Sequence, residues 1–145
     1  MKKFKLTSEF IVDISGVKLF RIKALIEFGN VKAGDLGGYI EKEENLSHMG
    51  NAWVSGNARV SGDAQVFGDA RVSGDKDYAY AHGFGSCNRT TTFFRLKDGD
   101  VGVRCGCFYG TLAQFRDNVC ETHGETKKAQ EYLMLADLMD FRFKN

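Results

Sequence analysis

The sequence predicts a mainly β fold organised around a short solenoid, with strands before it and a β-hairpin and two helices after it. Three observations support this prediction. Residues 50–75 repeat with a period of six, alternating apolar runs lie on both sides of the repeat, and residues 111–143 have helical periodicity. A fixed short period indicates a solenoid, because each repeat buries its apolar face against the next one.

The repeat reads GNAWVSGNARVSGDAQVFGDARVSGD, and four kinds of residue keep their places in it. Glycine begins each unit, Asn or Asp follows, then Ala, and Val comes two residues after Ala. Side chains alternate between faces along a strand, so Ala52 and Val54 are expected inside and Trp53 outside. Gly with Asn or Asp suits tight corners. The alternative is a set of ordinary hairpins or a glycine-rich linker, which the strict registration disfavours.

The unit V-x-G-[ND]-A-x resembles the hexapeptide repeat of left-handed parallel β-helices, the fold of the hexapeptide acyltransferases. The resemblance implies a short left-handed parallel β-helix with about eighteen residues per coil. Trp53 would then stack under Arg71, and Met49 under Phe67, about 4.8 Å apart and pointing outward. Outward apolar pairs are typical of protein contacts. Because proteins of this fold are usually homotrimers, these four residues are the candidate trimer interface.

Residues 1–30 are predicted to form an N-terminal strand region. Two apolar runs there flank Ser15-Gly16, a hairpin turn signal, although a helix from Val17 to Phe28 is the alternative. Residues 31–86 are assigned to the β-helix, and Glu41, Glu43 and Glu44 are interpreted as a solvated turn within its lead-in. The lead-in KLFRIKALIEFGNVKAGDLGGYIEKEENLSHMGNAWV resembles that of phage and prophage hexapeptide-repeat proteins.

Residues 87–145 are predicted to form a cap of one β-hairpin and two helices. The runs TTTFFRLK and DVGVRCGCFYG flank a turn that contains Asp98-Gly99. Thr111 is the expected N-cap of the first helix, with Gln114 completing a capping box, and Gly124 ends that helix. A second helix is expected over residues 125–143. The segment CGCFYGTLAQFRDNVCETHGETKKAQEYL also resembles the tail of the same phage proteins.

Composition excludes several classes of protein. The chain has 145 residues, of which 43% are hydrophobic, and a net charge of +1. That balance argues against a general binder of nucleic acid or of anionic membranes. No apolar stretch is long enough to span a bilayer, and the N-terminus lacks the apolar run of a signal peptide. We therefore expect a soluble protein of the cytoplasm, with its cysteines as thiols.

Two kinds of chemistry are open to the sequence. The acyltransferase resemblance implies a histidine general base and coenzyme A, and His82 is preferred to His48 and His123 because it lies at the frayed end of the repeat. The alternative is that His82 is a structural residue at the rim of the repeat, with no catalytic role.

The second chemistry is zinc binding by four soft ligands. The alternative is that the cysteines are buried free thiols. The candidate zinc ligands are Cys105, Cys107, Cys120 and His123.

A recognition surface is favoured over both chemistries, so we expect no cofactor. Trp53 stacked with Arg71 could hold a nucleotide base and phosphate, but the same residues are typical of a protein interface, which we prefer. Further arginines on the repeat and cap are Arg59, Arg89, Arg95 and Arg104.

The phage resemblance implies a non-enzymatic trimeric inhibitor in the host cytoplasm. It would act on a host defence protein, such as a CRISPR effector, or sequester a nucleotide immune signal. A CoA-dependent acyltransferase is the alternative.

Overall fold

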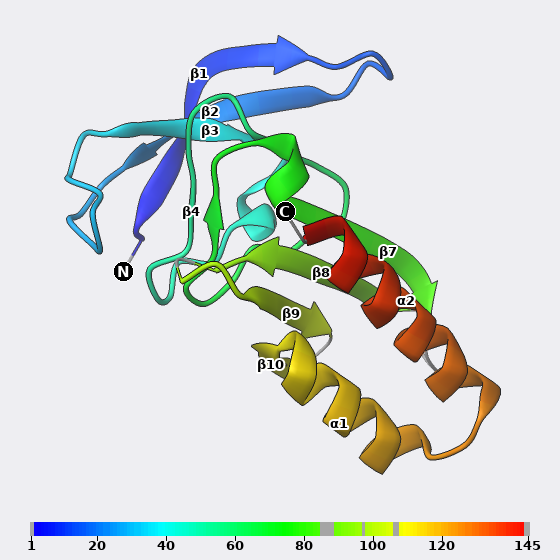
Figure 1. Ribbon diagram of the computed structural model, residues 1–145. Coiled ribbons are helices and arrows are strands. Elements are labelled where there is room, and N and C mark those ends of the chain that lie inside the picture. Colours follow the sequence, from blue (N-terminus) through cyan, green and yellow to red (C-terminus); the bar gives the residue numbers. More distant parts are fainter. Residues whose placement is uncertain (1, 85–88, 97, 106–107, 144–145) are drawn as a thin grey trace.

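The structure is a computed structural model that describes residues 2–84, 89–96, 98–105 and 108–143. Its strands form two four-stranded sheets and one two-stranded sheet, and two helices end the described chain (Figure 1). The strand orders are β1-β2-β3-β5, β10-β9-β8-β7 and β4-β6. The helices lie beside the second sheet, at the end of the molecule opposite β1 and β2 (Figure 1).

The first sheet begins with the predicted N-terminal hairpin. β1 and β2 pair antiparallel, which excludes the alternative of a helix from Val17 to Phe28. Asp13 shapes the turn, since its carboxylate accepts the backbone N–H groups of Ser15 and Val17 at 2.9 and 3.0 Å. β3 then pairs antiparallel with β2, and β5 pairs parallel with β3. The bounds are β1 (Phe4–Val12), β2 (Lys18–Ala24), β3 (Leu36–Ile40) and β5 (Arg59–Val60).

The repeat buries the residues that its period predicts. The side chains at its Ala and Val positions are at most 1% exposed, because both types point to the same side of each short strand. Trp53 pairs in parallel with Arg71, eighteen residues later, as expected. This pairing joins β4 (Trp53–Val54) to β6 (Arg71–Val72). The buried positions are Ala52, Val54, Ala58, Val60, Ala64, Val66, Ala70 and Val72.

The predicted left-handed parallel β-helix is wrong. Within the described part of the chain, no sheet forms a solenoid, and most strand pairs are antiparallel. Among the residues that the structure describes, parallel pairing is confined to β3–β5, β4–β6 and one bridge between Leu46 and Val66. The physical reason is that the regular repeat is short: β5 joins a sheet of N-terminal strands, β4 and β6 pair with each other, and the C-terminal flank forms a sheet of its own. The period correctly predicts the buried positions, but not the architecture.

The second sheet and the helices match the predicted cap in part. The hairpin across Gly99 forms between β8 (Arg89–Arg95) and β9 (Val101–Cys105), and β10 (Phe108–Thr111) extends it. The segment expected to continue the repeat instead forms β7 (Tyr78–Phe84), antiparallel to β8. Its large residues suit a half-exposed edge strand better than a narrow interior.

Both C-terminal helices lie where the sequence predicts them. α1 spans Leu112–His123, and its capping box forms because Thr111 and Gln114 exchange hydrogen bonds of 3.2 and 2.9 Å. Gly124 follows α1 with a φ of 60°, which favours glycine. α2 spans Lys127–Phe143 and packs against α1 and β7.

Two apolar cores meet at β8. The first core contains Phe4, Ile22 and the buried residues of the repeat, and the second lies between the second sheet and the helices. Phe94 belongs to the first core and Phe93 to the second, and neither ring is exposed. Successive residues of a strand face opposite ways, so β8 forms a wall of both cores.

Candidate functional site

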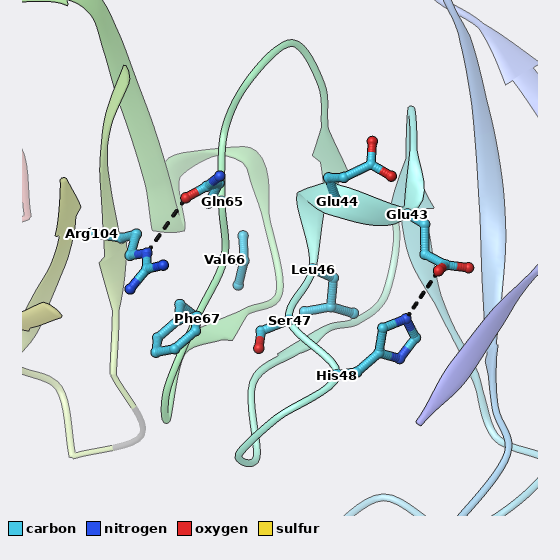
Figure 2. Close-up of a pocket in the computed structure, with 9 residues that line it drawn as sticks. All are labelled: Glu43, Glu44, Leu46, Ser47, His48, Gln65, Val66, Phe67 and Arg104. Carbon is cyan, nitrogen blue, oxygen red and sulfur yellow. Dashed lines mark hydrogen bonds and ion pairs between the residues drawn. The ribbon is translucent and has the colours of Figure 1, made fainter. Parts of the chain in front are cut away.

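Two adjoining hollows open where the repeat meets the second sheet. Their volumes are about 260 and 460 Å³, and they share Glu44, Gln65 and Arg104. Figure 2 shows the smaller hollow, with the repeat on one side and the turn before it on the other. The other residues that line it are Glu43, Leu46, Ser47, His48, Val66 and Phe67. The larger hollow adds Lys42, Asp63, Ala64 and Thr90.

Arg104, on β9, reaches across to the repeat. Its guanidinium carbon lies 4.4 Å from the centre of the Phe67 ring, and its Nε donates a long hydrogen bond of 3.5 Å to Oε1 of Gln65 (Figure 2). Stacking on an aromatic ring fixes the plane of a guanidinium and leaves its edges available for hydrogen bonds. In the described part of the chain, the long bond to Gln65 is the one polar contact of Arg104.

Phe67 also packs against Tyr109. The two rings meet edge to face at 5.1 Å, and the Tyr109 hydroxyl accepts the backbone N–H of Asp69 at 3.3 Å. Gly68 permits this approach, since a Cβ there would overlap the Tyr109 side chain. Met49 is 74% exposed and precedes Gly50, whose backbone lies against that of Gly68. The Arg104 surface is defined here as Met49, Phe67, Arg104 and Tyr109.

The acidic turn is solvated, as interpreted, only in part, because Glu44 is exposed whereas Glu41 and Glu43 bind other parts of the chain. Glu41 accepts the backbone N–H of Gly62 at 2.7 Å, and Lys42 pairs with Asp63 at 2.8 Å. Glu43 accepts a hydrogen bond of 3.2 Å from Lys2, which holds the pKa of the Glu43 carboxyl below its usual range. These contacts fix the wall of the hollows.

His48 lines the smaller hollow and is partly buried against the N-terminal strand. Its ring stacks on Phe4 at 4.2 Å, and its Nδ1 accepts the backbone N–H of Lys3 at 3.0 Å. In the neutral ring the proton is therefore on Nε2, which lies 3.4 Å from Oε2 of Glu43 (Figure 2). Nε2 is buried and has no aligned hydrogen-bond partner among the described residues. These contacts assign His48 a packing role.

His82, the predicted acyltransferase base, is exposed on β7. Its Nδ1 lies 2.7 Å from Oγ1 of Thr90, a residue that lines the larger hollow. A general base must reach the proton of the acceptor, and the ring of His82 is open to solvent on the edge strand of the second sheet. Catalysis by His82 with coenzyme A stays a prediction.

Two of the predicted zinc ligands, Cys105 and His123, contact the same residue, Tyr132, whereas Cys120 lies at the surface. Cys105 is buried, accepts a hydrogen bond from Thr91 at 3.3 Å, and lies 3.7 Å from the hydroxyl of Tyr132. Cys120 is exposed, and His123 stacks on Tyr132. Cys107 lies outside the described residues. Of the residues that are described, no three His, Cys, Asp or Glu side chains form a metal-binding group. Zinc binding by the full set stays a prediction.

Trp53 does not lie on an open face. It is 5% exposed and packs edge to face against Phe28 at 5.3 Å. The expectation that Trp53 points into solvent is wrong, because the N-terminal part of the chain covers this side of the repeat. Trp53 therefore contributes to the core within one chain, whereas Met49 and Phe67 remain at the surface. The trimer interface proposed for these residues and Arg71 stays a prediction.

Lys3 is buried beside this tryptophan. The side chain is 1% exposed, and its ammonium donates to the carbonyl oxygens of Ala52 at 2.6 Å and Gly50 at 3.4 Å. The ammonium also lies 4.5 Å from the centre of the Phe28 ring. Burial, together with the positive charge of Arg71, lowers the pKa of Lys3 to about 8. The sequence did not indicate that Lys3 is buried, because Lys3 lies among other basic residues, Lys2 and Lys5, near the start of the chain.

Replacing Lys3 should change the alkaline pH dependence of stability. The folded pKa of about 8 lies below the ordinary value of 10.5. The unfolded chain therefore binds more protons between these pH values, and folding is favoured as the pH rises through 8. We expect Lys3→Met to remove this gain, which is on the order of 1 kcal/mol after solvent screening. Urea unfolding at pH 7 and pH 10 measures it. Lys5→Met, at an exposed position of β1, should retain the wild-type gain, and an unchanged gain in Lys3→Met would contradict the assignment.

Of the other predicted arginines, Arg59 and Arg95 are not among the residues that line the two hollows. Arg95 binds Asp77 at 3.2 Å and the carbonyl oxygen of Phe143 at 3.3 Å. Arg59 is exposed on β5. Arg89 belongs to β8, and its side chain lies outside the described part of the structure. Sequence analysis missed Gln65 and Tyr109. A signal for Gln65 did exist, because it occupies the outward position of its repeat unit that Arg59 and Arg71 occupy in theirs.

The comparisons with known proteins identify no family for this chain. No family model matches it, and no curated protein matches it at a significant level. Among the described residues, no helix is long and apolar enough to cross a membrane. Function must therefore be inferred from the geometry of the surface itself.

Proposed function

We propose that the protein is a non-enzymatic binding protein that holds a protein partner at the Arg104 surface. The observation that carries this proposal is the guanidinium of Arg104, stacked on Phe67 beside the two hollows with a single long hydrogen bond. Arginine, tyrosine, phenylalanine and methionine are the residues enriched at protein interfaces. Ordered arginine and aromatic side chains are also the most frequent binding hot spots.

A protein partner fits this surface better than a nucleotide. A nucleotide base needs a free aromatic face on which to stack. Arg104 covers one face of Phe67, and Tyr109 packs against the same ring. The walls also carry both signs of charge, with Glu44 and Asp63 near Lys42 and Arg104. Mixed charges suit the varied side chains of a protein better than the uniform negative charge of a polyphosphate.

The resemblance of the lead-in and tail to phage proteins supports one class of partner, a host defence protein such as a CRISPR effector. On this proposal the protein is phage-encoded and inhibits by occupying a surface that the effector needs. Met49 and Phe67 are also candidates for the contact between subunits of a homotrimer. Native mass spectrometry of the purified protein gives the oligomeric state and therefore tests the homotrimer.

Replacing Arg104 should weaken binding to the target. We expect Arg104→Ala to raise the Kd for a purified CRISPR effector by at least tenfold, because truncating an arginine hot spot costs about 2 kcal/mol or more. Biolayer interferometry measures the Kd, and the plating efficiency of a targeted phage measures inhibition in cells. The matched control is Arg142→Ala, which removes the same charge from an exposed position at the end of α2.

Two outcomes would contradict the proposal. One is wild-type protein that binds no effector and restores no phage plating. The other is a Kd that changes equally in Arg104→Ala and Arg142→Ala. Circular dichroism of both variants separates a loss of contact from a loss of fold.

A further inference from the structure

Arg71 has an unpartnered, partly buried hydrogen-bonding edge beside Gly29. Its Nη2 lies 2.8 Å from the point at which a side chain on residue 29 would place its Cβ, so any residue larger than glycine would crowd that edge. Nε is on the same edge as Nη2. It is buried and has no hydrogen-bond acceptor among the described residues. Nε and Nη2 together form the fork that binds two oxygens of one carboxylate or phosphate group.

A second cation lies close to this edge. Lys3 is buried, and its two hydrogen bonds to Gly50 and Ala52 use two of the three ammonium protons. The ion pairs within residues 2–84, 89–96, 98–105 and 108–143 include neither Lys3 nor Arg71. Buried positive charge without an anion is costly. The lowered pKa of Lys3, caused by burial and then by Arg71, reflects the same imbalance.

The walls of this region are apolar. Phe28 lies under the ammonium of Lys3, and Trp53 packs against Phe28. Aromatic walls exclude water and so strengthen the attraction between a cation and an anion. Exposed Gly29 provides the side from which a small ligand can approach Nη2 of Arg71.

We propose that Arg71 and Lys3 form a binding site for a small oxyanion, whose phosphate or carboxylate oxygens accept hydrogen bonds from the Nε–Nη2 edge of Arg71 beside Gly29. Lys3 contributes positive charge from the interior. The site shares no residue with the Arg104 surface, so this inference stands or fails separately from the proposed function.

The test uses inorganic phosphate and the purified wild-type protein at constant ionic strength and pH 7. Nitrogen-15 NMR follows the Nε–H signal of Arg71, which we expect to shift with phosphate and to saturate. Thermal unfolding should show a rise in Tm of about 5 °C at a phosphate concentration ten times the Kd. Sulfate and acetate titrations then separate a preference for tetrahedral oxyanions from one for carboxylates, and saturation by either supports the site.

Arg71→Gln is the variant expected to lose phosphate binding, because glutamine keeps a polar side chain and removes the charge. We expect it to abolish the saturable rise in Tm. Arg59→Gln is the control, since Arg59 holds the same position between Ala and Val in its repeat unit and should leave the rise unchanged. An equal rise in both variants would overturn the proposal. So would an Nε–H signal of wild-type Arg71 that none of the three anions shifts, a result that does not depend on the folding of any variant.

Discussion

Phe94→Ala should lower the free energy of unfolding by about 4 kcal/mol, the cost of removing a large aromatic ring from a closed core. The Phe94 ring is fully buried, and it stacks near Tyr109 with centres 6.3 Å apart. Gly102 on the neighbouring strand gives the ring its space, since a Cβ at that glycine would lie 2.5 Å from Cε1 of Phe94. The cavity left by alanine would have rigid strands on both sides and would collapse only in part.

Chemical denaturation followed by tryptophan fluorescence measures this loss, because Trp53 belongs to the same core. Phe141→Ala is the matched control. Phe141 is 79% exposed on α2, and its replacement should change stability by less than about 0.5 kcal/mol. A loss below about 1.5 kcal/mol in Phe94→Ala would show that β8 does not close the first core.

Asn45→Ala should cost about 3 kcal/mol, although it removes only a small polar side chain. Asn45 is fully buried, and it makes four hydrogen bonds of 2.9–3.1 Å. Its Oδ1 accepts the backbone N–H groups of Glu41 and Lys42, and its Nδ2 donates to the carbonyl oxygens of Gly62 and Ala64. Alanine would leave four backbone groups without these partners, at about 1 kcal/mol or more for each one that water cannot reach.

Two further variants make the Asn45 prediction specific. Asn118→Ala, at an exposed position inside α1, should be neutral or slightly stabilising, because alanine favours a helix. Asn45→Asp should be at least as harmful as Asn45→Ala, since a carboxylate would face the carbonyl oxygens of Gly62 and Ala64. If Asn45→Asp unfolds at the wild-type denaturant concentration, the hydrogen-bond assignment is wrong.

The local elements could be predicted because each one depends on residues close together in the sequence. The turn near Gly16, the hairpin across Gly99 and the capping box of Thr111 all follow from local backbone preferences, and the structure confirms them. The six-residue period also identifies the buried Ala and Val positions, since alternation along a strand determines them.

The architecture could not be predicted from the same patterns. A period specifies which residues are buried, but it does not specify which strand lies at each sheet edge. β2 pairs with β3, and β7 pairs with β8, through contacts that the repeat does not encode. Met49, Phe67 and Arg104 were each predicted to lie at a recognition surface, but the contact that joins Arg104 to Phe67 was not predicted, for a similar reason. Arg104 meets Phe67 across 37 residues of sequence, and no local signal announces that contact.

The position of β8 bears on how such a chain can change its length. Repeat proteins commonly gain or lose whole units, because each unit contacts only its neighbours. In this protein the repeat is also matched to the second sheet, since Thr92 accepts the backbone N–H of Gln65 at 2.9 Å and Ala70 forms a bridge with Leu96. Inserting one unit between Gln65 and Ala70 would add six residues between these two points, whereas their partners Thr92 and Leu96 would stay four residues apart. The spacing of this part of the repeat is therefore set by the second sheet, and a unit added or lost there would require a compensating change in that sheet.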